Sequence, residues 1–124
     1  MSECVFCGIS SKKPPVIYGE YVVSILDDYP VSRGHCLVIP KRHVESISDL
    51  KDDELKDLYV VLDQTKQLLK QRYNPDGFNI GINEGEAAGQ TVPHLHIHII
   101  PRYKGDMEDP RGGVRGVIPE KQKY

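Results

Sequence analysis

Short apolar runs separated by turn residues predict strands in the first part of the chain. Residues 21–26 are mostly β-branched or apolar, and the aspartates and Pro30 that follow favour a turn and cannot continue a strand. Residues 35–39 form a second apolar run, closed by Pro40, which is typical of a strand facing a core. A shorter run at residues 16–18 predicts a further strand. These segments are therefore expected to build one sheet.

The period of the pattern changes at about Asp52. Apolar residues then recur at three- and four-residue steps, while lysines and aspartates fill the other positions; they are Leu55, Leu58, Tyr59, Leu62, Leu69 and Tyr73. This spacing predicts an amphipathic helix of about twenty residues. Acidic residues in its first turn and basic residues in its last turn complement the helix dipole. We expect the helix to end at residues 74–77, Asn-Pro-Asp-Gly.

Alternation of single residues returns after the helix and predicts two more strands. Residues 78–82 place Phe or Ile at every second position, and residues 94–100 alternate in the same way. The connection at residues 84–92 suits antiparallel pairing of these strands. Residues 102–124 are polar, glycine-rich and basic, and we interpret them as a C-terminal tail that orders against another surface.

Composition narrows the class of protein. The 124 residues fit one domain spanning 1–124, and 39% hydrophobic with 27% charged residues is typical of an ordinary globular protein. The formal charge of -2 gives no global field that recruits nucleic acid or an anionic membrane. The sequence shows neither a signal peptide nor an apolar run of the roughly 20 residues that span a bilayer. We therefore expect a cytoplasmic protein that captures any phosphate group locally.

Three of the five histidines stand in one row, as His94, His96 and His98. Because side chains alternate along a strand, the three imidazoles are predicted to share one face while the residues between them enter the core. An imidazole has a reference pKa of about 6.5, so near neutral pH it offers a lone pair that can attack phosphorus. The row therefore indicates a nucleophilic histidine that forms a phosphorus–nitrogen bond, which water then hydrolyses.

The loop before this row carries groups suited to phosphate. Gly85 and Gly89 let backbone amides approach an anion, and the side chains of Asn83, Gln90 and Thr91 can donate hydrogen bonds. Its spacing matches no recognised phosphate-binding loop, so taken alone it is an ordinary hairpin loop. Its position beside the histidine row makes phosphate binding the better interpretation.

Residues 94–100, His-Leu-His-Ile-His-Ile-Ile, match without exception the signature of the histidine triad (HIT) nucleotide hydrolases and transferases. The likeness extends over nearly the whole chain, through residues 26–30, 34–43 and 83–91. The sequence thus resembles this family. The resemblance implies an α+β fold in which an antiparallel sheet of about five strands carries one long helix and a short helix. It also implies a two-fold homodimer.

The resemblance further implies roles for single residues. His96 would be the nucleophile, His98 would contact the phosphate and help the leaving group, and the backbone carbonyl of His94 would orient His96. The implied substrate-binding set is Asp27 at the ribose hydroxyls, His35 beside the pocket, and Asn83, Gly89, Gln90, Thr91 and His98 around the phosphates.

Cys4 and Cys7 form a second constellation. Two thiolates at this spacing can bind one tetrahedral zinc ion, although from the residues alone a packed pair of thiols is an equally good interpretation. Bacterial and archaeal family members that begin with such a pair resemble this chain, and by that resemblance His43 and His94 would complete a structural zinc site. Such a closed site would pin the N-terminus to the sheet. Cys36, in an apolar strand, is interpreted as a small buried side chain.

The predicted function is hydrolysis at the α-phosphate of a nucleotide conjugate, either a dinucleoside polyphosphate or a nucleoside phosphoramidate. Three alternatives remain open at this point. A nucleotidyltransferase or phosphorylase of the same family would use the same pocket. A zinc-dependent metallohydrolase would use the histidine row as metal ligands. A nucleotide-binding regulator would use the pocket to bind a nucleotide, and hydrolysis would be incidental to its function.

Overall fold

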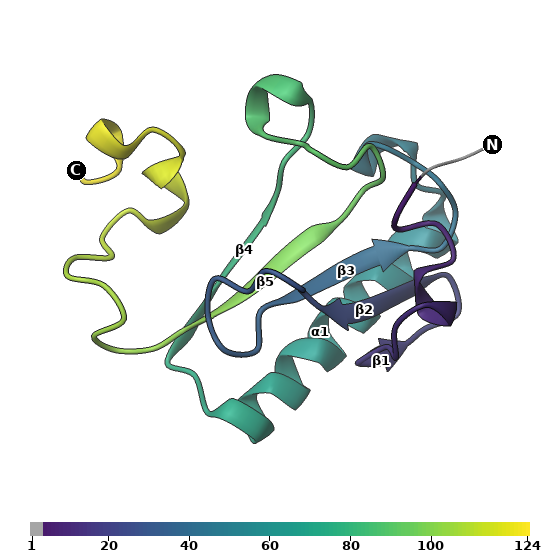
Figure 1. Ribbon diagram of the computed structural model, residues 1–124, viewed down its shortest axis with the longest axis horizontal. Coiled ribbons are helices and arrows are strands. Elements are labelled where there is room, and N and C mark those ends of the chain that lie inside the picture. Colours follow the sequence, from purple (N-terminus) through teal and green to yellow (C-terminus); the bar gives the residue numbers. More distant parts are fainter. Residues whose placement is uncertain (1–3) are drawn as a thin grey trace.

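A five-stranded open sheet forms the centre of the computed structural model, which describes residues 4–124 (Figure 1). The strands are β1 (Ile17–Tyr18), β2 (Val22–Leu26), β3 (Cys36–Pro40), β4 (Gly77–Ile82) and β5 (Ile97–Arg102). Their order in the sheet is β1-β2-β3-β5-β4, and each neighbouring pair is antiparallel. The predicted α+β class, the antiparallel sheet and the pairing of the last two strands are confirmed.

The long helix α1 (Asp52–Tyr73) crosses one face of this sheet (Figure 1). At its start, the backbone N–H of Lys51 donates to the carboxylate of Glu54 at 2.8 Å, which satisfies a donor that the helix itself leaves unpaired. At its end, Asn74 adopts the left-handed conformation with φ 52°. The predicted helix and its ends are therefore confirmed.

The buried stripe of α1 differs from the apolar positions that predicted the helix. Leu58, Val61, Thr65 and Leu69 lie against the sheet. Leu55 and Tyr59 are 49% and 66% exposed, respectively. The physical reason is the helical period: the four buried positions follow one line along the helix, whereas 55 and 59 lie on its flank.

The sheet has two faces that are covered differently. On the helix face, strand residues such as Val22, Cys36 and Val38 form one buried cluster with the inward residues of α1. Burial raises the pKa of the Cys36 thiol to about 11, in keeping with its prediction as a buried side chain. On the opposite face, Val23, Ile25, Leu37 and Ile39 form a second cluster, which is covered by Phe6 and Ile9 from the N-terminal segment.

Strand β5 begins at Ile97 and not at His94, where the alternating pattern had predicted its start. The N–H of His94 bonds to the carbonyl of Val92 at 2.8 Å, and the N–H of Leu95 bonds to the carbonyl of Val44 at 2.7 Å. The backbone N–H groups of His94 and Leu95 are therefore already bonded outside the β5 ladder, so they cannot extend the strand toward the N-terminus. Of the three histidines in the row, His98 alone lies on the strand.

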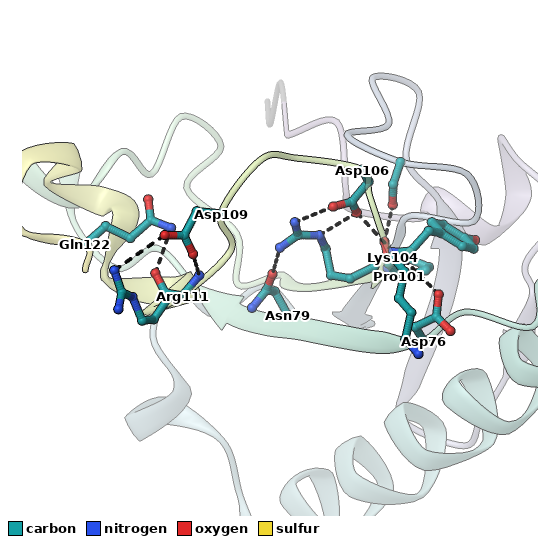
Figure 2. A network of polar contacts seen from close by, with 11 residues as sticks. Asp76, Asn79, Pro101, Lys104, Asp106, Asp109, Arg111 and Gln122 are labelled. Atoms are coloured by element: carbon teal, nitrogen blue, oxygen red, sulfur yellow. Dashed lines mark hydrogen bonds and ion pairs between the residues drawn. The ribbon is translucent and has the colours of Figure 1, made fainter. Parts of the chain in front are cut away.

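The C-terminal segment leaves the sheet and runs beside the edge strand β4 as two 3-10 helices, η4 (Gly113–Val117) and η5 (Pro119–Lys121) (Figure 1). Figure 2 shows the polar network at its beginning, where Asp106 and Asn79 bind the guanidinium of Arg102 from two sides. The backbone N–H of Lys104 donates to Asp76 at 2.8 Å. These bonds fix the direction in which the chain leaves β5.

Other short helical segments are also of the 3-10 type: η1 (Ile9–Ser11), η2 (Ile47–Asp49) and η3 (Glu86–Ala88). The short helix implied by the resemblance is thus represented by single 3-10 turns. Across residues 4–124, no helix has the length and apolar character that crossing a membrane requires.

Candidate active site and metal centre

A cavity of about 500 Å³ opens on the sheet face opposite α1. Its walls combine polar groups from three places: Asp27 after β2, Asn83, Gly89 and Thr91 from the loop between β4 and β5, and His96 and His98 at β5. Lys13, Asp28 and Tyr29 also line it, and apolar side chains form the rest of the wall. A volume of this size suits a small molecule of the dimensions of a nucleotide.

The ring of His96 is held by its own chain. Its Nδ1 lies 2.9 Å from the backbone carbonyl oxygen of His94, and because a carbonyl only accepts hydrogen bonds, Nδ1 carries the proton. The neutral ring then has its lone pair on Nε2. The side chain is buried at 7% exposure yet lines the cavity. His96 therefore has a fixed tautomer with one nitrogen able to attack.

A second hydrogen-bonded chain fixes His98. The backbone N–H of Val31 donates to Nδ1 of His35 at 2.9 Å, so the proton of neutral His35 sits on Nε2. That Nε2 lies 3.0 Å from Nδ1 of His98 and 3.3 Å from the carboxylate of Asp27. His35 thus donates to His98, which places the proton of neutral His98 on its Nε2. His98 and His96 are neighbours, with ring centroids 5.2 Å apart.

Burial sets the charge state of these rings. It lowers the pKa of His98, and the neighbouring His96 and His35 lower it further. Burial also lowers the pKa of His35, against the opposing influence of the Asp27 carboxylate. Both rings are therefore held neutral at physiological pH, the state in which the chain of donors described above exists.

The loop between β4 and β5 takes its shape from glycines and from Gln90. Gly85 and Gly89 adopt φ of 91° and 93°, a region that side chains other than glycine rarely enter. The amide of Gln90 bonds within the protein, accepting from the N–H of Gly85 at 2.8 Å and donating to the carbonyl of Glu45 at 3.2 Å. Among the predicted phosphate-binding residues, Gln90 therefore shapes the loop and does not line the cavity.

Cys4, Cys7, His43 and His94 come together beside the cavity, with their ligand atoms all within 4.8 Å of one another. The Nδ1 atom of His94 lies 3.3 Å and 3.6 Å from the sulfurs of Cys4 and Cys7. The Nδ1 atom of His43 lies 3.3 Å from the sulfur of Cys7. Two sulfurs and two imidazole nitrogens are the donor set that tetrahedral zinc prefers.

The environment of His94 supports this fit. Its Nε2 donates to the backbone carbonyl of Pro40 at 2.8 Å, so its Nδ1 holds the lone pair that faces the two sulfurs. The ring is fully buried, and burial lowers its pKa, which favours the neutral form that a metal needs. The four residues therefore fit a zinc ion.

The row of three histidines does not converge on one point within residues 4–124. His94 belongs to the cluster with the cysteines, and His98 belongs to a separate group with Asp27 and His35. In that second group, His35 receives the Val31 N–H on Nδ1, so its Nε2 carries a proton and has no lone pair for a metal. The geometry therefore disfavours the metallohydrolase interpretation on chemical grounds.

Sequence reasoning missed the apolar wall of the cavity. Its members on the described residues are Val5, Phe6, Ile9, Ile25, Leu37 and Val92. Ile25 and Leu37 pair directly across β2 and β3, and strand alternation already places both on one face. That signal was available. The positions of Val5 and Phe6 were not readable, because no local pattern shows which part of the sheet a segment outside it covers.

Comparison with known proteins gives the family. Residues 10–105 match the HIT domain. The chain belongs to the HIT family. A HIT-like protein of Methanocaldococcus jannaschii is 44% identical over 108 residues, which cover 85% of this chain and 83% of that protein. A bis(5'-adenosyl)-triphosphatase of Dictyostelium discoideum is 45% identical over 80 residues, which cover 64% of this chain and 54% of that enzyme.

Solved structures of the HIT family share the fold. A Zn-bound histidine triad family protein from Mycobacterium smegmatis superposes with a TM-score of 0.75 at 38% identity, covering 86% of this chain and 80% of that one. The family resemblance found in residues 94–100 is thus confirmed by sequence and by fold.

Proposed function

We propose that this HIT protein hydrolyses a nucleotide conjugate at its α-phosphate through a nucleotidyl-histidine intermediate on His96. The observation that carries the proposal is the hydrogen bond from Nδ1 of His96 to the His94 carbonyl at 2.9 Å, which leaves Nε2 with its lone pair in a ring that lines the cavity. The Dictyostelium relative that acts on bis(5'-adenosyl) triphosphate supports this substrate class.

The chemistry proceeds in two displacements. Nε2 of His96 forms a bond to phosphorus while the bond from phosphorus to the leaving group breaks, and Nε2–H of neutral His98 donates a hydrogen bond that stabilises the charge on that leaving group. An amine leaving group takes its proton from water. The His94 carbonyl stabilises the positive charge that develops on His96. Water then attacks phosphorus and displaces His96, and the proton that the water loses passes to the solvent, which regenerates the neutral ring of His96.

The remaining residues bind the substrate in this proposal. Asp27 accepts from the ribose hydroxyls, and Asn83, Gly89 and Thr91 bind phosphate oxygens. His35 keeps the proton of His98 on Nε2, and Gln90 holds the loop in shape through its bonds to Gly85 and Glu45. The positions of Asp27, Asn83, Gly89 and Thr91 in the cavity wall support the binding roles proposed for them.

We also propose that Cys4, Cys7, His43 and His94 hold a structural zinc ion, as their donor set and the tautomer of His94 support. Bound there, the ion would supply a fixed four-ligand crosslink between the N-terminal segment and the sheet, with no position open for substrate. Elemental analysis of purified protein tests this: one equivalent of zinc is expected, and Cys4→Ser should lose it.

A two-fold homodimer is the assembly that we propose. The edge strand β4 exposes Ile80, and α1 exposes Leu55 and Tyr59, so apolar surface remains for a partner copy. Light scattering at micromolar concentration should give twice the chain mass of 14.0 kDa, and a monomer would contradict this part of the proposal.

Trapping the intermediate tests the function itself. The protein is mixed with adenosine and guanosine phosphoramidates and dinucleoside polyphosphates, quenched, and analysed by mass spectrometry for a nucleotidyl group on His96. His96→Ala should lose the adduct and at least about 10⁴-fold of kcat/KM while it still binds a nucleoside monophosphate. Turnover that survives in His96→Ala would contradict the mechanism. Transfer to added phosphate in preference to water would make the protein a phosphorylase.

A further inference from the structure

The two cysteines of the metal cluster enclose two residues of the cavity wall. Cys4 and Cys7 lie with His43 and His94 in the cluster. Val5 and Phe6, which stand between the cysteines in the chain, line the cavity. The two ends of this four-residue segment therefore belong to the metal cluster and its two middle residues to the cavity wall, so an interaction that fixes the ends also positions the middle.

Phe6 lies between the two sites. Its ring centroid is 5.0 Å from that of His96 at 62°, and 6.1 Å from that of His94 at 88°. Both arrangements are edge-to-face contacts of the kind that favour aromatic pairs. The same ring packs on the apolar cluster of β2 and β3 on the sheet face opposite α1, which we call the N-terminal face because the N-terminal segment covers it. Phe6 thus contacts a metal-cluster residue, the proposed nucleophile and the sheet.

Backbone pairing within the sheet does not hold this segment in place. It belongs to no strand of the sheet, and its first helical turn begins only at Ile9, whose N–H bonds to the carbonyl of Phe6 at 3.2 Å. Ordering a segment outside the sheet costs conformational entropy, which its side-chain contacts must offset. An ion bound by Cys4, Cys7, His43 and His94 would offset much of this entropy through its binding free energy.

We propose that metal binding and nucleotide binding are thermodynamically coupled through Phe6. The bound ion would hold the segment so that Phe6 and Val5 complete the cavity wall, and a nucleotide packed against that wall would hold the segment for the ion in turn. The inference rests on the proposed function, because it requires the cavity to bind a nucleotide. It adds that the metal site controls substrate affinity from outside the reacting groups.

Coupling of this kind is reciprocal, which makes it measurable from both sides. With zinc bound, the dissociation constant for AMP should be about tenfold lower than in chelator-treated protein, within the usual range for coupled sites. With saturating AMP, the dissociation constant for zinc, measured by competition with a chelating dye and starting from loaded protein, should fall by the same factor. Isothermal titration calorimetry gives the first value, and circular dichroism checks the fold.

A matched pair of variants tests whether Phe6 carries the coupling. The chain has two phenylalanines, and Phe78 lies on β4, at the opposite edge of the sheet from β1 and outside the cavity lining. Phe6→Leu should keep one equivalent of zinc yet reduce the AMP effect on zinc affinity to less than about threefold. Phe78→Leu should retain the full tenfold effect. Equal coupling in both variants would overturn the role of Phe6.

Other outcomes separate this inference from the proposed function. If zinc-loaded protein binds AMP but zinc leaves its dissociation constant unchanged, the coupling is overturned and the proposed function stands. If loaded protein fails to bind AMP, both are overturned. If the ion acted only through the His94 carbonyl on His96, its removal would lower kcat and leave AMP affinity unchanged, and this result also overturns the inference. A matched change in both dissociation constants supports it.

Discussion

The two faces of the sheet are formed by the same strands, but one face is part of a closed core and the other borders the cavity. On the helix face, side chains of β2, β3 and β5 meet α1 in one closed cluster. On the N-terminal face, the alternate residues of β2 and β3 are covered by Phe6 and Ile9, and there the cavity opens. Strand alternation delivers apolar residues to both faces, so the covering segment decides which face becomes a core and which becomes a site.

This difference separates stability from chemistry. A 22-residue helix with fixed ends seals the helix face. The N-terminal face is covered by a short segment outside the sheet. Of the two histidines that line its cavity, His96 donates to the backbone carbonyl of His94 and His98 accepts a hydrogen bond from His35. Mutations on the two faces should therefore act on different measured quantities.

The largest difference in stability is expected between two leucine-to-alanine variants, one on each face of the sheet. Leu69 on α1 is 2% exposed, and Leu37 on β3 is 5% exposed and lines the cavity. Leu69→Ala should lower the free energy of unfolding by about 3–4 kcal/mol, because it leaves a closed void. Leu37→Ala should cost about 1–2 kcal/mol, because its space joins an open cavity, and it should weaken nucleotide binding.

Urea denaturation and AMP titration of the two leucine variants check this pair. Equal losses of stability, or weaker AMP binding in Leu69→Ala than in Leu37→Ala, would contradict the division between the faces.

A smaller loss is expected at the start of α1. The carboxylate of Glu54 is nearly buried, accepts two hydrogen bonds from Arg42 and one from Lys51, and its pKa is lowered to about 2, chiefly by Arg42. Glu54→Gln should cost about 2 kcal/mol at neutral pH, since charged hydrogen bonds are lost. Glu108→Gln, at an exposed position, should stay within about 0.5 kcal/mol.

The sign of the pH dependence also distinguishes Glu54. Its pKa is lowered on folding, so its contribution is present above the unfolded value of 4.5 and is lost as the pH falls toward about 2. Chemical denaturation at several acidic pH values should therefore show the gap between wild type and Glu54→Gln closing. A gap independent of pH would mean that the charge of Glu54 does not stabilise the helix.

On the cavity face, His35 should affect rate and not stability alone. His35→Leu removes the donor to Nδ1 of His98, so His98 can carry its proton on the wrong nitrogen, and kcat should fall about 10- to 100-fold with little change in KM. His35→Gln, whose amide can still donate, should recover part of the rate. A pH–rate profile of both variants completes the test, and an unchanged acid limb would argue against a role for His35 in positioning the proton of His98.

The smallest effect is the stability lost in mild acid. Burial lowers the pKa of His35 and His98 below 6.5, with Asp27 opposing and the neighbouring histidines reinforcing the shift of His98. Below pH 6.5 the unfolded chain then binds protons that the folded protein does not, so stability should fall as pH drops. Each ring contributes at most about 1.4 kcal/mol per pH unit. Denaturation curves at pH 7.5 and 5.5 measure it, and His35→Gln should flatten the slope.

Local patterns predicted much of the fold and part of the site. The helix and the strands were readable because each has its own period of apolar residues, and the histidine row was readable from residues 94–100 alone. The start of β5 was not, because backbone bonds of residues 94 and 95 to Val92 and Val44 compete with the ladder. The contact of His35 with His98 joins positions 63 residues apart, which no local period reveals.

The sequence by itself determined which residues share a face of each element, since side-chain direction follows from the periods of helix and strand. The tertiary structure alone decided what lies opposite each face. It brings Cys4 to His94, 90 positions away in the chain, and places Phe6 between the metal cluster and the proposed nucleophile. It also directs the side chain of Gln90 to a hydrogen bond within its own loop. The reason is physical. Periodicity is a property of neighbouring residues, whereas the covering of a face depends on where distant segments gain the most by packing.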